Sequence, residues 1–353
     1  MGGSEYQAKI LIDYLRQNKS FCISYIYAGS KRSKIKIDGT EVYALRRRKV
    51  LSKLGRSFFL DFGKIISILK SIQPNLLYQR VGFAYTGISA YYARKNNCRM
   101  IWHIASDNDV KPLQLGLKTM IQPFNYIDKK LLEYGIKNAD LIIGQTKQQN
   151  ELLKENYGRE CDFIIPNVHP EPNGQIRKTD PVRVVWVSNL KPLKQPELFI
   201  QLAERFRDHQ NVKFIMIGRQ VRNKWQAKLE SRMEKLNNLE YLGEKPINDV
   251  NRILCESHIL VNTSQYEGFP NTFIQAWMRR VSVVSLNVDP DGVIEHNKIG
   301  FHSRSFEKLV SHTRQLIENK WLREQMGKRA YEFSVRAHSL DANIEKMIKL
   351  FGG

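Results

Sequence analysis

The chain has 353 residues, 42% of them hydrophobic, which is more than one ordinary core holds and enough for two domains. No apolar run approaches the roughly 20 residues of a membrane span, and the N-terminal MGGSEYQAKI lacks the basic and apolar regions of a signal peptide. Basic residues number 56 against 35 acidic residues, and the first 70 residues hold 15 basic and 5 acidic. The four cysteines are far apart and lack metal-ligand spacing, so we expect reduced cytosolic thiols.

Two basic clusters lie in this first fifth of the chain, at residues 31–36 and 46–49. Clusters of this size attract anionic lipid surfaces by roughly 1 kcal/mol per charge, and they also attract nucleic acid. A solvated basic face needs no partner and is the simpler alternative. No aromatic residues for base stacking are interleaved with these charges, which favours a membrane over single-stranded nucleic acid.

The first half of the chain alternates between helical and strand-like apolar patterns. A long apolar and basic segment at 111–134 is interrupted by glycine and proline, and a turn-rich polar stretch near residue 170 is typical of a linker. Helices are predicted at 8–15, 54–72 and 147–157, and strands at 21–27, 41–45, 76–78, 100–104, 141–143 and 163–165.

The second half repeats this alternation, and two such blocks predict an α/β protein with two doubly wound parallel-sheet domains. A ligand would bind at the carboxyl ends of the strands, in the crevice between the blocks. We expect the C-terminal helices to pack on the second domain. Strands are predicted at 182–187, 213–217, 239–243, 259–261 and 282–285, and helices at 196–206, 248–255, 272–280, 308–317, 320–333 and 340–351. The expected divisions are an N-terminal domain at 1–168, a linker at 169–180, a C-terminal domain at 181–338 and a C-terminal helix at 339–353.

The stretch from Ser264 to Trp277 follows a buried strand and carries the most chemistry. Gly268 and Pro270 break the apolar pattern, and Asn271 is predicted to cap the next helix. A helix N-terminus directs free backbone N–H groups at a ligand and favours anions. Because Glu267 lies beside this anion site, a ligand with both phosphate and hydroxyl groups, such as a nucleotide-sugar, would suit it. The alternative is a turn between a strand and a helix that binds no ligand, as in any α/β protein.

An ordered series of motifs resembles the retaining family 4 glycosyltransferases of the GT-B fold, within glycosyl transferases group 1. The resemblance extends from Gly2 to about Phe351 and implies two Rossmann-like domains that face a central cleft. The matching segments are Gly2-Gly3-Ser4-Glu5, Ile165-Pro166-Asn167, Val187 to Lys194, Phe214 to Gly218, Leu242-Gly243, Glu267 to Gln275 for the family's Glu-x7-Glu, and Gly300-Phe301.

The resemblance also implies roles for single residues. Lys194 would balance the charge that grows on the diphosphate leaving group, and Glu267 would hold the sugar. His103, at the end of a strand, would lie over the sugar from the acceptor side. The donor-binding residues implied are Gly2, Gly3, Asn189, Lys191, Gly218, Gly268, Phe269, Pro270, Asn271 and Gln275.

Each role has a simpler alternative. The alternative for Lys194 is an ordinary solvated lysine, and the alternative for His103 is a core histidine with satisfied hydrogen bonds. Asp107 and Asp109 suit caps of the following helix, and Arg219 suits a surface loop. The resemblance implies a reaction that needs no metal or other cofactor.

The chain departs from the family pattern at three places. Asn189 stands where the family has arginine, and Lys191 is not equivalent to arginine at a bidentate site. Gln275 replaces the second glutamate, although an amide still bonds to ribose hydroxyls. The usual strand before the Gly-Gly motif is missing, so either the sequence is truncated there or the first sheet lacks its inner strand.

We therefore expect a retaining hexosyl- or N-acetylhexosaminyltransferase that uses a UDP- or GDP-linked sugar. The expected acceptor is lipid-linked or a polysaccharide of the cell surface. The expected location is cytoplasmic, peripheral at the anionic inner face of the membrane. One alternative is a catalytically impaired or non-catalytic GT-B protein. A basic nucleic-acid-binding protein is less favoured because no nucleic-acid-binding module is present, so we expect no nucleic-acid partner.

Overall fold

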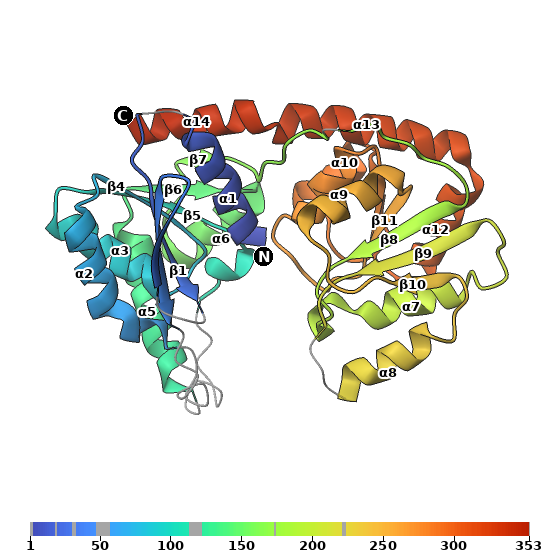
Figure 1. The fold of residues 1–353 in the computed structure, drawn as a ribbon, viewed down its shortest axis with the longest axis horizontal. Coiled ribbons are helices and arrows are strands. Elements are labelled where there is room, and N and C mark those ends of the chain that lie inside the picture. The colour runs from blue at the N-terminus through green and yellow to red at the C-terminus, as the bar shows by residue number, and fades with distance from the viewer. Residues whose placement is uncertain are drawn as a thin grey trace. The chain divides into compact units, whose positions relative to one another are not determined.

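The protein divides into two compact units, each described here by itself (Figure 1). The first unit comprises Met1–Pro166 and Ile344–Gly353, and the second comprises Asn167–Asn343. The predicted linker at 169–180 groups with the second unit. The computed structural model describes residues 3–17, 20–29, 33–46, 57–112, 122–172, 174–220 and 224–352.

The first unit opens with helix α1 (Gly3–Leu15) and a three-stranded sheet in the order β1-β3-β2. Strand β1 (Ser24–Gly29) runs parallel to β3 (Thr40–Arg46), whereas β2 (Ser33–Ile37) runs antiparallel to β3. The turn between β2 and β3 is Asp38-Gly39, with φ of 45° and 85°. Asp-Gly is a strong hairpin signal. The sequence thus held the signal for β2, a strand that we interpreted only as part of a basic cluster.

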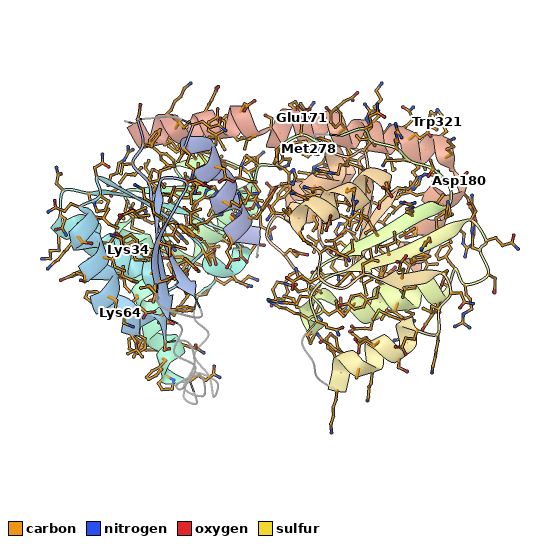
Figure 2. All side chains as sticks on the ribbon, viewed as in Figure 1. Lys34, Lys64, Glu171, Asp180, Met278 and Trp321 are labelled. Carbon is orange, nitrogen blue, oxygen red and sulfur yellow. The ribbon has the colours of Figure 1, made fainter. Side chains whose placement is uncertain are left out.

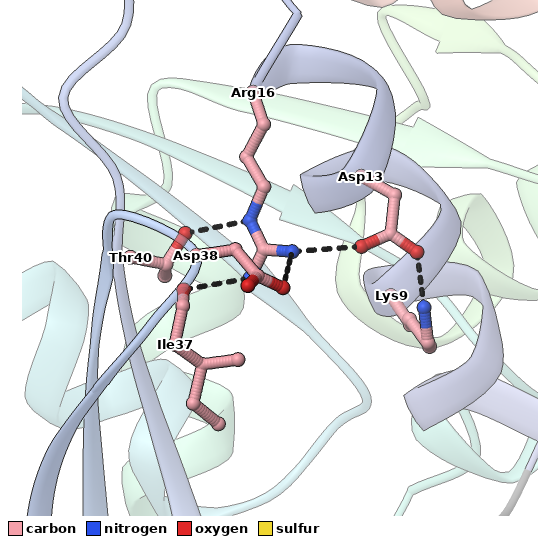
Figure 3. A network of polar contacts seen from close by, with 6 residues as sticks. All are labelled: Lys9, Asp13, Arg16, Ile37, Asp38 and Thr40. Atoms are coloured by element: carbon pink, nitrogen blue, oxygen red, sulfur yellow. Dashed lines mark hydrogen bonds and ion pairs between the residues drawn. The ribbon is translucent and has the colours of Figure 1, made fainter.

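Arg16, just after α1, holds that helix to the β2–β3 turn (Figure 3). Its Nε donates to Thr40 Oγ1 at 3.0 Å, and its Nη2 donates to the Ile37 carbonyl at 3.1 Å. Its Nη1 contacts the carboxylates of Asp13 and Asp38 at 3.1 and 3.3 Å. One planar guanidinium therefore joins the end of the helix to both sides of the hairpin turn.

The second sheet of the first unit is wholly parallel, in the order β4-β5-β6-β7. Helices α3 and α5 approach closely because they carry Gly87 and Gly135. A Cβ added at Gly87 would lie 2.1 Å from the Leu131 carbonyl oxygen. The elements are β4 (Leu76–Arg80), β5 (Arg99–His103), β6 (Leu141–Gly144), β7 (Phe163–Ile164), 3-10 helices at Phe58–Asp61 and Asp107–Asp109, and helices α2 (Phe62–Ile72), α3 (Ala84–Lys95), α5 (Pro123–Asn138) and α6 (Lys147–Tyr157).

The second unit contains a six-stranded parallel sheet in the order β10-β9-β8-β11-β12-β13. The direction of winding reverses between β8 and β11, which are hydrogen-bonded neighbours. In doubly wound sheets, ligands bind outside the carboxyl ends of the strands at such a reversal. The elements are β8 (Val182–Val187), β9 (Val212–Ile217), β10 (Leu239–Tyr241), β11 (Ile259–Asn262), β12 (Ser282–Ser285), β13 (Gly300–His302), 3-10 helices at Pro192–Lys194 and Pro290–Gly292, and helices α7 (Pro196–Glu204), α8 (Lys224–Met233), α9 (Ile247–Glu256), α10 (Asn271–Trp277), α11 (Val293–His296), α12 (Phe306–Glu318) and α13 (Lys320–His338).

Apolar side chains cover both faces of the six-stranded sheet of the second unit. One face packs with residues of α7, α8 and α12, and the opposite face packs with residues of α9, α10 and α11 (Figure 1). Val184 and Trp186 belong to the first cluster and Val185 to the second, as the alternation of side chains along a strand requires. Met278 lies fully buried in the second cluster, whereas Trp321 lies 69% exposed at the outside (Figure 2).

The C-terminal helix α14 (Leu340–Gly352) corrects one expectation. The C-terminal helices were expected to pack on the second domain, yet residues from Ile344 onward group with the first unit. The ring of Phe351 contacts Phe21 and Tyr78, and the Arg99 guanidinium donates to the Leu350 carbonyl at 2.9 Å. Through these contacts, the last residues of α14 pack on the first unit.

The structure confirms most predicted elements, and the predicted bounds of α6, β8 and β12 agree with it. Helix α3 was not predicted because it is buried on nearly all sides and so lacks a polar face with helical spacing. Strand β13 and helix α8 were also not predicted. In the described part of the chain, no helix is both long and apolar enough to cross a membrane. Residues 31, 32 and 47–49 of the two basic clusters, and residues 113–121 of the predicted segment at 111–134, lie outside the described residues.

Candidate active site

Lys194 and Glu267, which the sequence resemblance brings together, form an ion pair in the second unit. The Lys194 Nζ lies 2.8 Å from Glu267 Oε2, and the two side chains are 19% and 18% exposed. Lys194 ends the 3-10 helix after β8, and Glu267 lies in the loop after β11. Because β8 and β11 are neighbouring parallel strands, the segments after them meet at one edge of the sheet, where the winding reverses.

The other oxygen of Glu267 is held by two side chains that the sequence analysis missed. Asn262 Nδ2 donates to Glu267 Oε1 at 3.0 Å, and Ser264 Oγ donates to the same oxygen at 2.6 Å. Asn262 Oδ1 also accepts from the Ser264 backbone N–H at 3.1 Å, so one amide fixes both the turn and the carboxylate. Both residues are buried. The carboxylate of Glu267 thus has two hydrogen-bond donors at one oxygen and a cation at the other.

A buried hydrogen-bond chain fixes the backbone of Lys194. The Trp186 indole N–H donates to Thr263 Oγ1 at 2.9 Å, and that hydroxyl donates to the Lys194 carbonyl at 2.7 Å. The Gln265 N–H donates to the Leu193 carbonyl at 2.9 Å. The loops after β8 and β11 are therefore hydrogen-bonded to each other at two points beside the ion pair. Their pairing depends on strand order, which a single sequence does not reveal.

The start of helix α10 differs from the prediction for Asn271. Pro270 is the N-cap and offers no side-chain acceptor, so Asn271 is the first helical residue and not the cap. The Phe273 N–H, in the first turn of the helix, donates to the Pro270 carbonyl at 3.0 Å. Phe269 is buried against Trp277 and His338, so its side chain serves the core. Contacts of this loop with a donor stay a prediction.

Gln275 lies on α10, 3% exposed, and its amide already has a partner. Its Nε2 donates to Asn251 Oδ1 on α9 at 3.0 Å. The Arg279 guanidinium donates to the backbone carbonyls of both residues at 3.0 Å. Because the amide hydrogen-bonds through nitrogen, its Oε1 is the atom that remains to accept from a ribose hydroxyl. Asn251 thus holds the side chain of Gln275, a contact that the spacing motif did not reveal.

The other predicted donor-site residues of the second unit lie on adjacent loops after β8 and β9. Asn189 is half-buried and Lys191 exposed. Gly218 follows β9, where an added Cβ would lie 1.6 Å from the Ser188 carbonyl oxygen. The Leu190 N–H donates to the Arg219 carbonyl at 3.0 Å. The absence of a side chain at Gly218 thus allows two backbone segments to approach closely. The exposed Arg219 lies in the same loop.

His103 ends β5 in the first unit, as predicted, and is buried with 1% exposure. Its Nδ1 lies 2.7 Å from the Tyr78 hydroxyl and 3.3 Å from Arg80 Nη1. Burial, with the nearby Arg80 charge, holds the pKa of His103 well below its usual range, so the ring is neutral. The contacts at Nδ1 are typical of a core histidine, whereas the buried Nε2 has no hydrogen-bond partner among the described residues. Contact with a sugar stays a prediction.

Two further groups of the first unit were singled out from the sequence. Gly3 is the first residue of α1, and Gly2 lies outside the described residues. Asp107 and Asp109 were expected to cap a helix, and Ser106 is the N-cap of the 3-10 helix that contains them. Asp109 takes part in the capping box, because its carboxylate accepts the backbone N–H of Ser106 at 3.1 Å, and it also accepts that of Ala105 at 2.9 Å.

One group of side chains in the described ranges has the composition of a metal site. Ligand atoms of Asp289, Glu295 and His302 lie within 4.8 Å of one another. Arg304 binds both oxygens of Glu295 at 2.6 Å, and Asp289 accepts the N–H groups of Ile294 and Glu295. These carboxylates are already committed to protein donors. The expectation that the reaction needs no metal stays a prediction.

Two curated proteins are similar in sequence to this chain. A poly(ribitol-phosphate) alpha-N-acetylglucosaminyltransferase of Staphylococcus aureus (strain COL) is 28% identical over 236 residues, which cover 63% of this chain and 46% of that protein. An uncharacterized glycosyltransferase of Haemophilus influenzae is 22% identical over 100% of this chain and 96% of its own length. The chain spans about half the length of the first curated relatives, 46% and 58% of them.

Solved structures share the fold at low sequence identity. Sucrose-phosphate synthase from Thermosynechococcus elongatus has a TM-score of 0.78 at 13% identity and covers 99% of this chain and 93% of that one. HepE of Anabaena, crystallised with UDP, has a TM-score of 0.72 at 15% identity, with coverage of 99% and 96%. These likenesses confirm the predicted α/β class with two Rossmann-like units of the GT-B kind. A family model described as "Glycosyl transferases group 1" matches residues 170–333. The second unit therefore carries a domain of the glycosyl transferases group 1 family.

Proposed function

We propose that this protein is a glycosyltransferase that uses a nucleoside-diphosphate sugar as donor. The Lys194–Glu267 pair, which follows β8 and β11 where the sheet reverses, is the observation that carries this proposal. A fixed cation there can stabilise the negative charge that develops on the diphosphate as the bond to the sugar breaks. The neighbouring carboxylate can accept hydrogen bonds from hydroxyl groups of the sugar.

The donor that we propose is UDP-linked, and the sugar transferred is a hexose or an N-acetylhexosamine. Support comes from named relatives: HepE is crystallised with UDP and with UDP-glucose, and the Staphylococcus aureus relative is named as an N-acetylglucosaminyltransferase. A GDP-linked donor is the alternative. We further propose retention of anomeric configuration, as in the family 4 enzymes that the motifs resemble. NMR of the product would refute retention if the new glycosidic bond had the opposite anomeric configuration to the donor.

A screen of UDP- and GDP-sugars for released diphosphate tests the activity. Glu267→Ala and Lys194→Ala should each reduce release at least about 100-fold, the usual cost of losing one electrostatic stabiliser. Glu240→Ala and Lys213→Ala are the matched controls. They break an exposed ion pair of the same unit, at 2.6 Å and far less buried, and should leave release unchanged. Unchanged turnover in either site variant would refute the catalytic role assigned to that residue.

We propose that the acceptor is lipid-linked or a growing cell-surface polysaccharide, met at the inner face of the cell membrane. The excess of 15 basic over 5 acidic residues in the first 70 supports this proposal. Phe58 and Phe59, two aromatic residues of the same basic region, add little support because their rings pack against Phe83, Tyr85 and Phe124. Flotation with vesicles at physiological salt should show a preference for anionic over zwitterionic lipid. Equal recovery with both kinds of vesicle would contradict it.

A non-catalytic protein of the same fold is the second candidate. It is favoured by Asn189 and Gln275, which stand where the family has charged residues, and by the amide of Gln275 being bonded to Asn251. Calorimetry with UDP and GDP separates the candidates. Binding of neither nucleotide supports the non-catalytic protein, whereas binding together with turnover removes it.

A further inference from the structure

Lys194 and Glu267 bind each other with the groups that a donor would use. The ammonium is the proposed partner of the diphosphate, and the carboxylate is the proposed partner of the sugar. They lie 2.8 Å apart, and each side chain is less than one-fifth exposed. A diphosphate therefore competes with Glu267 for the same cation.

The two partners differ in freedom. Glu267 Oε1 is held by Asn262 and Ser264, so its carboxylate keeps its place when the cation leaves. The backbone of Lys194 is held by Thr263, and its charge sits at the end of a flexible four-carbon chain. The ammonium can thus move to a diphosphate and return, while the carboxylate stays.

We propose that this ion pair acts as a charge latch that weakens binding of the nucleoside diphosphate once the sugar has left, and so promotes its release. This inference rests on the proposed function. When an intact donor binds, the diphosphate takes Lys194, and sugar hydroxyls donate to Glu267 in its place. After transfer, Glu267 has lost those hydroxyl donors, and its charge draws Lys194 back from the diphosphate. The carboxylate therefore penalises the product more than the donor.

The latch also explains selection of a complete donor. A free sugar can only replace the cation that Glu267 already has, and a free nucleoside diphosphate draws that cation away, so that Glu267 Oε2 loses Lys194. Only a ligand with both an anion and hydroxyl groups compensates both residues. The site is therefore specific for a joined nucleotide and sugar and binds each half weakly.

Calorimetric titration with UDP, and in parallel with GDP, tests the latch in the full chain. Glu267→Gln keeps an acceptor for Asn262 and Ser264 but removes the charge that holds Lys194, so UDP should bind about tenfold more tightly than to the wild type. The gain should shrink in high salt, because it is electrostatic. Glu267→Ala, which also removes the charge, should show the same gain and serves as a second variant if one of the two folds poorly.

Two controls separate the latch from other effects. Glu240→Gln adds the same unit of positive charge to the second unit at an exposed pair and should leave UDP affinity unchanged. Adding Lys194→Met to Glu267→Gln should remove the gain. Equal or weaker UDP binding in both Glu267 variants, with measurable binding to the wild type, overturns the latch alone. Binding of neither UDP nor GDP to any variant overturns the proposed function together with the latch.

Discussion

Replacement of Thr263 by valine tests the physical account of the site most directly. Valine has nearly the shape of threonine, so the change removes the hydroxyl and leaves the packing of this fully buried residue intact. The Trp186 indole N–H, also buried, then has no acceptor, which costs about 1–3 kcal/mol, and the bond to the Lys194 carbonyl costs about 1 kcal/mol more. We expect a loss of about 2–4 kcal/mol in the free energy of unfolding of the second unit.

Urea denaturation followed by tryptophan fluorescence measures this loss. Of the 5 tryptophans only Trp102 lies in the first unit, so the signal mainly reports the second. Thr263→Ser keeps the hydroxyl and is the matched control, which should lose about 1 kcal/mol for one buried methyl group. Donor turnover by Thr263→Val should fall even where the protein is folded, because the backbone of Lys194 is released. A valine variant as stable as the serine variant would refute this account.

Three further predictions concern the second unit. Gly218→Ala should destabilise it by about 3 kcal/mol or more in urea denaturation, because the new Cβ meets the Ser188 carbonyl oxygen at 1.6 Å; a loss below about 1 kcal/mol would contradict that geometry. Burial lowers the pKa of His338 to about 4, so its stabilising contribution is complete above pH 6.5 and falls as pH drops toward 4. The wild type should thus lose about 2 kcal/mol more than His338→Gln between pH 7 and pH 5, and equal losses would disprove it. Gln275→Glu offers the ribose a charged acceptor, and since the Asn251 amide can rotate to donate to it, the KM for the donor should fall; a higher KM would mean that the present amide pair is the better ribose contact.

The local structure of the second unit was largely predictable from sequence. The β-branched run of β8 and the apolar run of β11 are buried on both faces, so their patterns stand out against the polar loops around them. Glu267 was identified beside a predicted helix N-terminus, and Gln275 through the resemblance to the family's Glu-x7-Glu motif. Where local signals conflict, prediction failed: Asn271 suits a cap, but the preceding Pro270 takes the cap position.

The contacts between segments were decided only by the tertiary structure. Strand order brings β8 beside β11, and this adjacency alone places Lys194 against Glu267, although Thr263 and Lys194 are 69 residues apart. The same packing gives Glu267 its donors and binds the amide of Gln275 to Asn251. A sequence pattern has the period of one element and carries no record of which elements are neighbours. The sequence thus indicated candidate side chains for the chemistry, and the folded sheet decided which of them meet.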